Sequence, residues 1–219
     1  MHNFRLLSTK CLPIAAQNRL IQTGASYSCW DFIESNPKPF EAEVRDKALI
    51  FTSQNAVNAV IKHLQLNDNP CYCVGEKTKK RLEENGQKVV KMTQNAADLA
   101  DFILKNVKNA SFLFFTGTQR MPVIEAAFQA HQRLLEVVEV YTTTARPKAV
   151  GQYDAVLFYS PSGVESFHQD NKLEQAQGFA LGNTTAEALK KYTHNIITAK
   201  QPTIEHLTAT VRKYITTLA

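Results

Sequence analysis

The segment Ala48-Leu-Ile-Phe-Thr-Ser-Gln-Asn-Ala-Val57 is matched further along the chain by Ala155-Val-Leu-Phe-Tyr-Ser-Pro-Ser-Gly-Val164. A second pair of segments, Val74-Gly75-Glu-Lys-Thr78 and Leu181-Gly182-Asn-Thr-Thr185, matches at the same offset of 107 positions. An unchanged offset over two separate segments is hard to obtain by chance, and it indicates an internal duplication. The duplication decides the fold, because both copies are expected to form the same elements.

A weaker pair of segments extends the duplication. Phe4–Ile14 resembles Phe112–Val123, since in each an apolar run leads through Thr and a basic residue to a proline. We name the shorter repeated segment A (near residues 4–32 and 111–141) and the longer one B (near residues 46–106 and 153–218). The chain order A-B-A-B leaves two arrangements open. The lobes are either two consecutive A-B pairs, or a crossed pairing of the first A with the last B and of the first B with the second A.

Each B segment alternates between strand-like and helix-like patterns. Leu49–Thr52 and Val156–Tyr159 are short apolar runs, typical of strands buried on both faces of a parallel sheet. Ser160-Pro161 predicts the start of a helix with the serine as N-cap, and Thr184-x-x-Glu187 fits a capping box. Strands separated by helices predict an α/β fold in two similar lobes, each a parallel sheet flanked by helices.

Two stretches between the segments do not fit a helix. Residues 27–40 hold Trp30, Pro37 and Pro39 after a β-prone start, and residues 138–147 are β-branched and end in Pro147. We expect both to be extended connectors. The crossed pairing requires both connectors to pass between the lobes, so two matching extended connectors favour it.

The composition is that of an ordinary globular protein. The 219 residues are 44% hydrophobic and 21% charged, which excludes wholesale disorder. No apolar run approaches the roughly 18 residues of a membrane span, and the first ten residues have no secretory apolar region, so we expect a cytoplasmic protein without a membrane anchor. The net charge of +5 suits an anionic small molecule. Without a lysine-arginine tract, it does not indicate a nucleic-acid partner.

The cysteines and histidines do not indicate a metal site. The four cysteines show neither metal-binding spacing nor a C-x-x-C pair, and the six histidines are scattered along the chain. Cys71 and Cys73 lie two residues apart in an apparent strand, so they are expected on one side of it, as small apolar core residues. We expect no metal.

In open parallel α/β sheets, ligands bind beyond the carboxyl ends of the strands, where helices begin. The duplicated motifs fall at such places, and their amide N–H groups and hydroxyls can bind an anion, although a Ser or Thr there can also simply cap a helix. We expect these motifs to bind one anionic ligand together. The candidate residues are Ser53, Gln54, Asn55, Gly75, Lys77, Thr78, Thr116, Gly117, Arg120, Ser160, Pro161, Ser162, Gly163, Gly182, Thr184 and Thr185.

Motifs for other chemistries are missing. The chain has neither the G-x-x-x-x-G-K-[ST] phosphate loop nor G-x-G-x-x-G, so standard nucleotide binding is not indicated. The G-x-S-x-G pattern of hydrolases is also missing.

Several short motifs occur in a fixed order over nearly the whole chain. They are Ile50-Phe51-Thr52-Ser53 with Ala56-Val57, Val74-Gly75 with Thr78, Val140-Tyr141-x-Thr143, Phe158-x-Ser160-Pro161-Ser162-Gly163-Val164, Gly182-x-Thr184-Thr185-Ala186-x-Ala188-Leu189 and Pro202-Thr203. Each is weak alone, but together they resemble the uroporphyrinogen-III synthase family. The chain departs from the family pattern at Lys10, where many members have arginine after the threonine, and at Gln54-Asn55.

The resemblance implies a cyclase without a cofactor that acts on hydroxymethylbilane, a linear tetrapyrrole rich in carboxylates. The terminal hydroxyl leaves as water, and the last ring attacks through its substituted carbon to form a spiro intermediate. Fragmentation and reclosure then invert that ring and give uroporphyrinogen III. The family fold has two lobes joined by a two-stranded connector, the first lobe made from both chain ends. It implies lobes of residues 1–30 with 146–219 and of residues 36–140.

The resemblance also implies roles for individual residues. Tyr141 matches the tyrosine of the family motif and is the candidate proton donor to the departing hydroxyl. The alternative is that Tyr141 only packs as a connector residue. Candidate cations for the substrate carboxylates are Lys10, Lys77, Arg120 and Arg146.

A different class of function stays open at this point. Two-lobed α/β chains also serve as binding modules that clamp a small polyanion without chemistry. For either function we expect a monomer by default, and the enzyme would make at most transient contact with the enzyme that produces the bilane.

Overall fold

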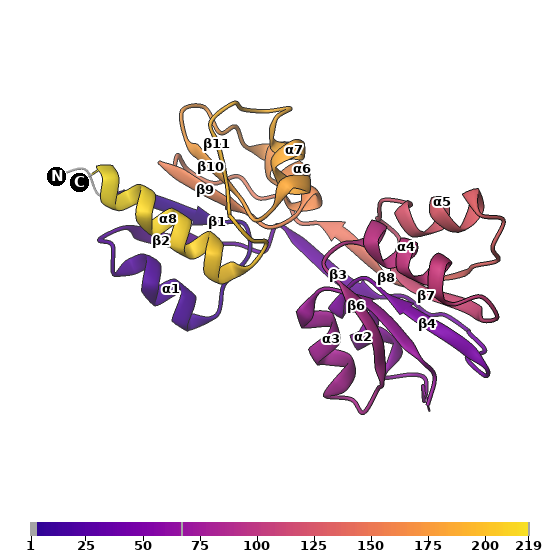
Figure 1. The fold of residues 1–219 in the computed structure, drawn as a ribbon. Coiled ribbons are helices and arrows are strands. Elements are labelled where there is room, and N and C mark those ends of the chain that lie inside the picture. The colour runs from indigo at the N-terminus through magenta and orange to yellow at the C-terminus, as the bar shows by residue number, and fades with distance from the viewer. Residues whose placement is uncertain (1–3, 67, 219) are drawn as a thin grey trace. The chain divides into compact units, whose positions relative to one another are not determined.

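The structure, a computed structural model, describes residues 4–66 and 68–218 (Figure 1). The chain divides into two compact units. Unit 1 takes both ends of the chain, up to Glu34 and from Thr144 onward, and unit 2 is Ser35–Thr143. Each unit holds one sheet, and the expected α/β class of two similar lobes is confirmed.

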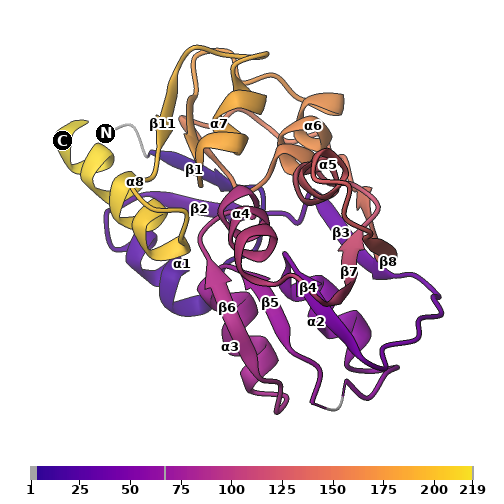
Figure 2. The same cartoon turned by 45° about the vertical axis from the view of Figure 1, so that its right-hand side comes forward.

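Unit 1 is built on a five-stranded parallel sheet in the order β11-β10-β9-β1-β2. The strands are β1 (Arg5–Ser8), β2 (Ser26–Cys29), β9 (Ala155–Phe158), β10 (Gln177–Ala180) and β11 (Ile196–Thr198). Helices α1 (Ile14–Ile21) and α8 (Ile204–Leu218) cover one face, while α6 (Pro161–Asp170) and α7 (Asn183–Leu189) cover the other (Figure 2). Both faces of these short strands are therefore buried, which explains their continuous apolar runs.

Unit 2 is built on a six-stranded sheet in the order β3-β8-β7-β4-β5-β6. The strands are β3 (Ile33–Pro37), β4 (Lys47–Phe51), β5 (Cys71–Val74), β6 (Val89–Thr93), β7 (Ser111–Gly117) and β8 (Glu136–Ala145). Helices α2 (Gln54–Val60) and α3 (Glu76–Glu83) pack on one face, and α4 (Ala96–Asn106) and α5 (Val123–Ala130) pack on the other. All strands from β8 to β6 run parallel.

The two sheets repeat one order of strands. In unit 1 the A strands β2-β1 are followed across the sheet by the B strands β9-β10-β11, and in unit 2 the A strands β8-β7 are followed by the B strands β4-β5-β6. The first A segment thus shares a sheet with the last B segment, and the second A segment shares a sheet with the B segment that precedes it. This is the crossed pairing.

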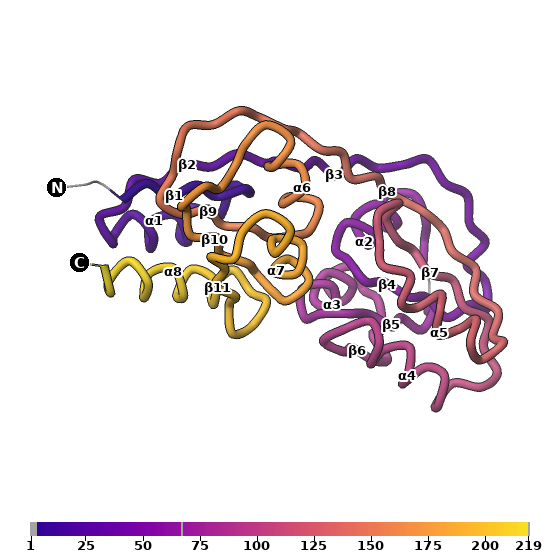
Figure 3. The backbone as a smooth tube through the Cα atoms, turned by 90° about the horizontal axis from the view of Figure 1, so that it is seen from above, coloured from indigo at the N-terminus to yellow at the C-terminus, as the bar shows by residue number. Residues whose placement is uncertain are grey.

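The connectors are extended strands that lie side by side (Figure 3). The amide of Lys38 donates to the carbonyl of Val140 at 3.0 Å, and the amide of Arg146 donates to the carbonyl of Phe32 at 2.7 Å. Partners rise in number along β3 as they fall along β8, so the two strands are antiparallel. The two-stranded connector is confirmed.

The helix starts follow the expected chemistry with one exception. Ser160 caps α6, its Oγ accepting from the amide of Gly163 at 3.1 Å, with Pro161 in the first turn. The capping box at Thr184 is wrong, because α7 begins one residue before it, at Asn183, with Gly182 as N-cap. Thr184 therefore lies inside the first turn.

The cysteines behave in two ways. Cys71 and Cys73 are buried on the same side of β5, as expected, and burial raises the pKa of each thiol to about 12. Cys11 and Cys29 form a disulfide that the sequence pattern did not indicate. Parallel pairing sets Ser8 beside Cys29, and this brings Cys11 within reach across the turn after β1.

Among the described residues, none of the helices has the length and apolar character that crossing a membrane requires.

Candidate active site

In unit 2, the expected loops gather at the carboxyl edge of the sheet. Ser53 follows β4 and caps α2, its Oγ accepting from the amide of Ala56 at 3.1 Å. Gly75 follows β5 with φ of 83°, a left-handed conformation that favours glycine, and precedes α3. Gly117 ends β7. The three strands are neighbours in the sheet, so their ends lie along one edge.

Tyr141 of β8 lies at the same edge. Its Oη accepts a hydrogen bond from Ser53 Oγ at 3.1 Å, although the two residues are 88 positions apart in the chain. The ring also lies against Gly117, where a methyl group on the glycine would meet the ring at 2.5 Å. Because Ser53 is the donor in this bond, the phenol hydrogen of Tyr141 is available for another acceptor.

The other candidates in unit 2 differ in exposure. Gln54, Asn55 and Lys77 are exposed, whereas Thr78 and Thr116 are buried. Asn55 Nδ2 donates to Ser35 Oγ of β3 at 2.9 Å, which holds the start of α2 against the connector. The exposed side chains can contact a ligand directly, whereas the side chains of Thr78 and Thr116 are covered by the protein.

Arg120 is surrounded by carboxylates. Its Nε lies 2.6 Å from Glu125 Oε1 and its Nη1 lies 3.1 Å from Glu139 Oε1. Glu139 is also paired with Lys38 at 2.7 Å, and hydrogen bonds from Lys38 and Arg120 lower the pKa of the Glu139 carboxyl. The charge of Arg120 is therefore compensated within the protein, which makes it a weaker candidate for binding a substrate carboxylate than the sequence indicated.

Unit 1 has a corresponding carboxyl edge. Three segments follow neighbouring strands there: residues 9–10 after β1, residues 159–163 after β9 and residues 181–185 after β10, the last two running into the first turns of α6 and α7. Lys10 and Thr184 are exposed, Ser162 and Gly182 are partly exposed, and Thr185 is buried. The placement repeats that of unit 2, as the duplication predicts.

A hydroxyl pair at this edge was missed in the sequence. Ser8 Oγ and Tyr159 Oη lie 2.8 Å apart, and burial raises the pKa of the Tyr159 phenol although its bond with Ser8 lowers it in part. The duplication could have pointed to this position, because the offset of 107 aligns Tyr159 with Thr52, which also carries a hydroxyl. Burial keeps Tyr159 neutral, so it serves as a hydrogen-bonding group rather than a charge.

The chain matches a family of known proteins over most of its length. The family model described as HEM4, uroporphyrinogen-III synthase HemD, matches residues 16–209, which is most of the chain. The chain belongs to the uroporphyrinogen-III synthase family. No curated protein matches it at a significant level.

Solved structures share the fold of this synthase-family chain at low sequence identity. The uroporphyrinogen-III synthetase of Helicobacter pylori has a TM-score of 0.74 at 20% identity, over 96% of this chain and 99% of that one. A mutant uroporphyrinogen III synthase of Thermus thermophilus has a TM-score of 0.69 at 14% identity, over 98% of both chains. The likeness extends to the whole chain, so both units belong to the family fold.

Two further basic groups lie on the unit 1 side of the connector. Arg146 and Lys148 stack on the Trp30 ring, with the guanidinium carbon and the ammonium nitrogen 5.0 Å and 4.1 Å from its centroid. Trp30 Nε1 also donates to the carbonyl of Arg146 at 3.1 Å. These contacts hold the two cations in place by attraction to the ring face.

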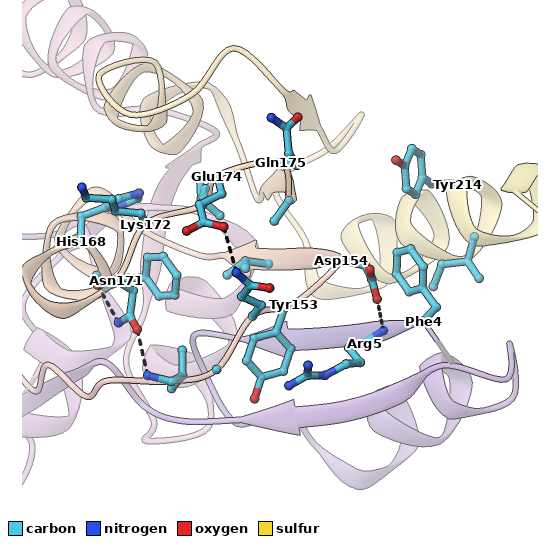
Figure 4. A pocket seen from close by; sticks show the side chains of 18 of the residues that line it. Phe4, Arg5, Tyr153, Asp154, His168, Asn171, Lys172, Glu174, Gln175 and Tyr214 are labelled. Atoms are coloured by element: carbon cyan, nitrogen blue, oxygen red, sulfur yellow. Dashed lines mark hydrogen bonds between the residues drawn. The ribbon is translucent and has the colours of Figure 1, made fainter. Parts of the chain in front are cut away.

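A hollow of about 1290 Å³ lies elsewhere in unit 1 (Figure 4). Arg5, Asp154 and Ala176 line it, and each lies at or just before the start of a strand. The hollow is therefore at the amino edge of the sheet, whereas the family motifs lie at the carboxyl edge. Ligands of parallel α/β sheets ordinarily bind at the carboxyl ends, so the candidate site is the edge that carries the motifs.

Proposed function

We propose that this chain converts hydroxymethylbilane into uroporphyrinogen III with loss of one water, as a cyclising lyase. Membership of the synthase family supports an enzyme over a binding module that only clamps a polyanion. The bilane loses its hydroxyl readily and closes unaided to the isomer with an uninverted ring. The protein therefore has mainly to hold the two end rings in the disfavoured approach, which is catalysis by orientation.

The hydrogen bond from Ser53 to Tyr141 carries the proposed chemistry. Tyr141 donates its phenol proton to the terminal hydroxyl, the carbon–oxygen bond breaks, and the pyrrole nitrogen supplies the electron pair that stabilises the resulting cation. Ser53 steadies the phenolate left behind. The last ring attacks, fragments and recloses, and the proton that it releases at the end balances the one that Tyr141 gave.

The remaining candidates bind the substrate carboxylates in this proposal. In unit 2 these are the exposed side chains and amides of the loops after β4, β5 and β7, and in unit 1 they are those after β1, β9 and β10. Exposed Lys10 and Lys77, together with Arg146, supply positive charge. Amide N–H groups at the helix starts add neutral donors that suit carboxylates.

The product isomer tests the function directly. The purified chain is supplied with hydroxymethylbilane, the product is oxidised, and the porphyrin isomers are separated by chromatography. We expect the type III isomer. Type I alone, the spontaneous product, would contradict the proposal and is what a binding module without catalysis would leave.

A cytoplasmic monomer that receives the bilane from the enzyme producing it is part of the same proposal. Light scattering measures the mass of the chain in solution, with 24.6 kDa expected. The transfer is tested by coupling the chain to the bilane-producing enzyme. A direct hand-over should give a shorter lag before type III product appears than free diffusion of the bilane between the two enzymes.

A further inference from the structure

Gly117 leaves no room for a side chain beneath Tyr141. A Cβ on Gly117 would lie 2.5 Å from Tyr141 Cζ, 2.6 Å from Cε2 and 2.9 Å from Oη. Carbon atoms that are not bonded pack at about 3.5–4.0 Å, so even a methyl group must displace the ring. The reason for glycine is this close approach, because Gly117 is not among the residues with positive φ.

The strand pairing explains why the ring lies there. Thr116 of β7 pairs with Glu139 of β8, but Gly117 pairs with Tyr141, so the ladder shifts by one residue at Val140. The neighbours Val140 and Tyr141 consequently pack against the same core cluster, which regular strand alternation does not allow. Such a bulge redirects a side chain, and here it turns the Tyr141 ring onto Gly117.

The hydroxyl end of the ring is held separately. Ser53 Oγ accepts from the amide of Ala56 and donates to Tyr141 Oη, so the cap of α2 holds the serine oxygen in place beside the phenol. The backbone of Tyr141 is held as well, since its carbonyl accepts from the amide of Thr118 at 3.1 Å. The ring thus has one support at its backbone, one at its face and one at its hydroxyl.

We infer that Gly117 is a positioning residue for the reaction: its lack of a side chain sets the Tyr141 phenol in hydrogen-bond reach of Ser53. The inference rests on the proposed function, in which Tyr141 is the proton donor. A side chain at position 117 moves the phenol off Ser53 and away from the departing hydroxyl. The effect falls on turnover, because Gly117 is buried and has no side chain of its own to bind the substrate.

The central test is Gly117→Ala. We expect kcat for type III product to fall about ten- to a thousand-fold, because a displaced general acid loses part of the roughly 10²–10⁴-fold that a positioned one contributes, with KM within about three-fold. Gly151→Ala is the matched control, because its Cβ would meet only the flexible end of Arg5, at 3.3 Å, and turnover should not change. A folded Gly117→Ala protein with turnover within two-fold of the parent would overturn the inference.

A double-variant comparison shows whether Gly117 acts through Tyr141. In the Tyr141→Phe background the proton donor is already lost, so adding Gly117→Ala should lower kcat by less than two-fold more. Full additivity of the two losses would overturn the inference, because it would give Gly117 a separate role.

Folding is tested by removing the ring. If Gly117→Ala fails to fold, Gly117→Ala with Tyr141→Ala should fold, since the added methyl group then has space. If the double variant also fails while Tyr141→Ala alone folds, glycine is needed for another reason and the inference is wrong.

A spectroscopic measurement separates this inference from the proposed function. With 3-fluorotyrosine at position 141, the ¹⁹F chemical shift reports the surroundings of the phenol. Gly117→Ala and Ser53→Ala should both move the resonance toward that of free 3-fluorotyrosine, because each separates the phenol from its serine donor. This readout needs no substrate, so it stands even if the parent chain yields only type I product; an unchanged resonance in Gly117→Ala would refute the positioning.

Discussion

Tyr141, the proposed proton donor, is positioned by its neighbours. A partly exposed tyrosine on a strand would ordinarily be free to turn toward solvent. Here the ring rests on Gly117 and the hydroxyl accepts from Ser53 at 3.1 Å. A phenol held in this way can give its proton without a charged neighbour, which suits a reaction whose first step is the loss of a hydroxyl group.

Tyr141→Phe is expected to slow formation of type III product by about ten- to a thousand-fold, because the proton donor is lost while the ring contact with Gly117 remains. Initial rates of type III formation measure the change, and circular dichroism checks that the variant is folded. A folded variant with unchanged turnover would remove Tyr141 from the mechanism.

The two neighbouring threonines of α7 should behave differently. Thr184 is exposed in the first turn, whereas Thr185 is 2% exposed. Thr184→Val should raise KM by about 2- to 12-fold, the equivalent of one hydrogen bond of about 0.5–1.5 kcal/mol. Thr185→Val should shift the melting temperature and leave KM near that of the parent chain. Steady-state kinetics and thermal unfolding of both variants distinguish the two roles, and equal KM values in the two variants would contradict this assignment.

The ion-pair network around Glu139 links three elements of unit 2. Glu139 lies on β8, Lys38 follows β3, and Arg120 lies between β7 and α5. The network holds the loop after β7 against the connector strand. It is partly exposed, since the Glu139 side chain is 34% accessible, so its contribution to stability is small and sensitive to salt.

The acid dependence of stability tests this network. The folded-state pKa of Glu139 lies below its ordinary value of 4.5, so its pairing stabilises the fold above that pH and the effect is lost as the pH falls through the folded-state pKa. Glu139→Gln should therefore lower the free energy of unfolding at pH 7, by less than about 1 kcal/mol. Urea unfolding at pH 7 and at pH 3 should show that difference shrinking in acid; an equal difference at both pH values would count against the ion pairs.

At the scale of elements, the sequence predicted what depends on nearby residues. The strand runs, the Ser160 cap and the side of β5 that buries Cys71 and Cys73 all follow from short-range patterns. The start of α7 did not, because Gly182 and Thr184 are both acceptable cap residues and the chain uses the earlier one. Local patterns predict the type of an element more reliably than the residue at which it begins.

Contacts between distant residues could not be read from the sequence. The bond between Ser53 and Tyr141 exists only because β8, β7 and β4 are consecutive in the sheet. The compensation of Arg120 depends in the same way on Glu139 of β8. The family motif pointed to Tyr141, but only the sheet order places Ser53 and Gly117 beside its ring.

The whole chain is a duplication in which each unit carries its own core. Among the described residues, the buried apolar side chains form four clusters, and each cluster draws on one unit only. Unit 2 takes its sheet and both covering layers from a single stretch of chain, apart from the connector residues at its ends. Unit 1 must instead join residues before 35 with residues after 143, so its central pair β1–β9 closes a long loop.

This difference predicts how the two units fold in isolation. A fragment of residues 35–143 should unfold cooperatively in urea, because both of its core clusters are complete, whereas a fragment of residues 144–219 lacks β1, β2 and α1 and should not. Adding a peptide of residues 1–34 to the second fragment should restore part of its cooperativity by supplying those elements. Circular dichroism and intrinsic fluorescence follow each transition. If residues 144–219 fold alone, or if residues 35–143 do not, the independence of the two cores is refuted.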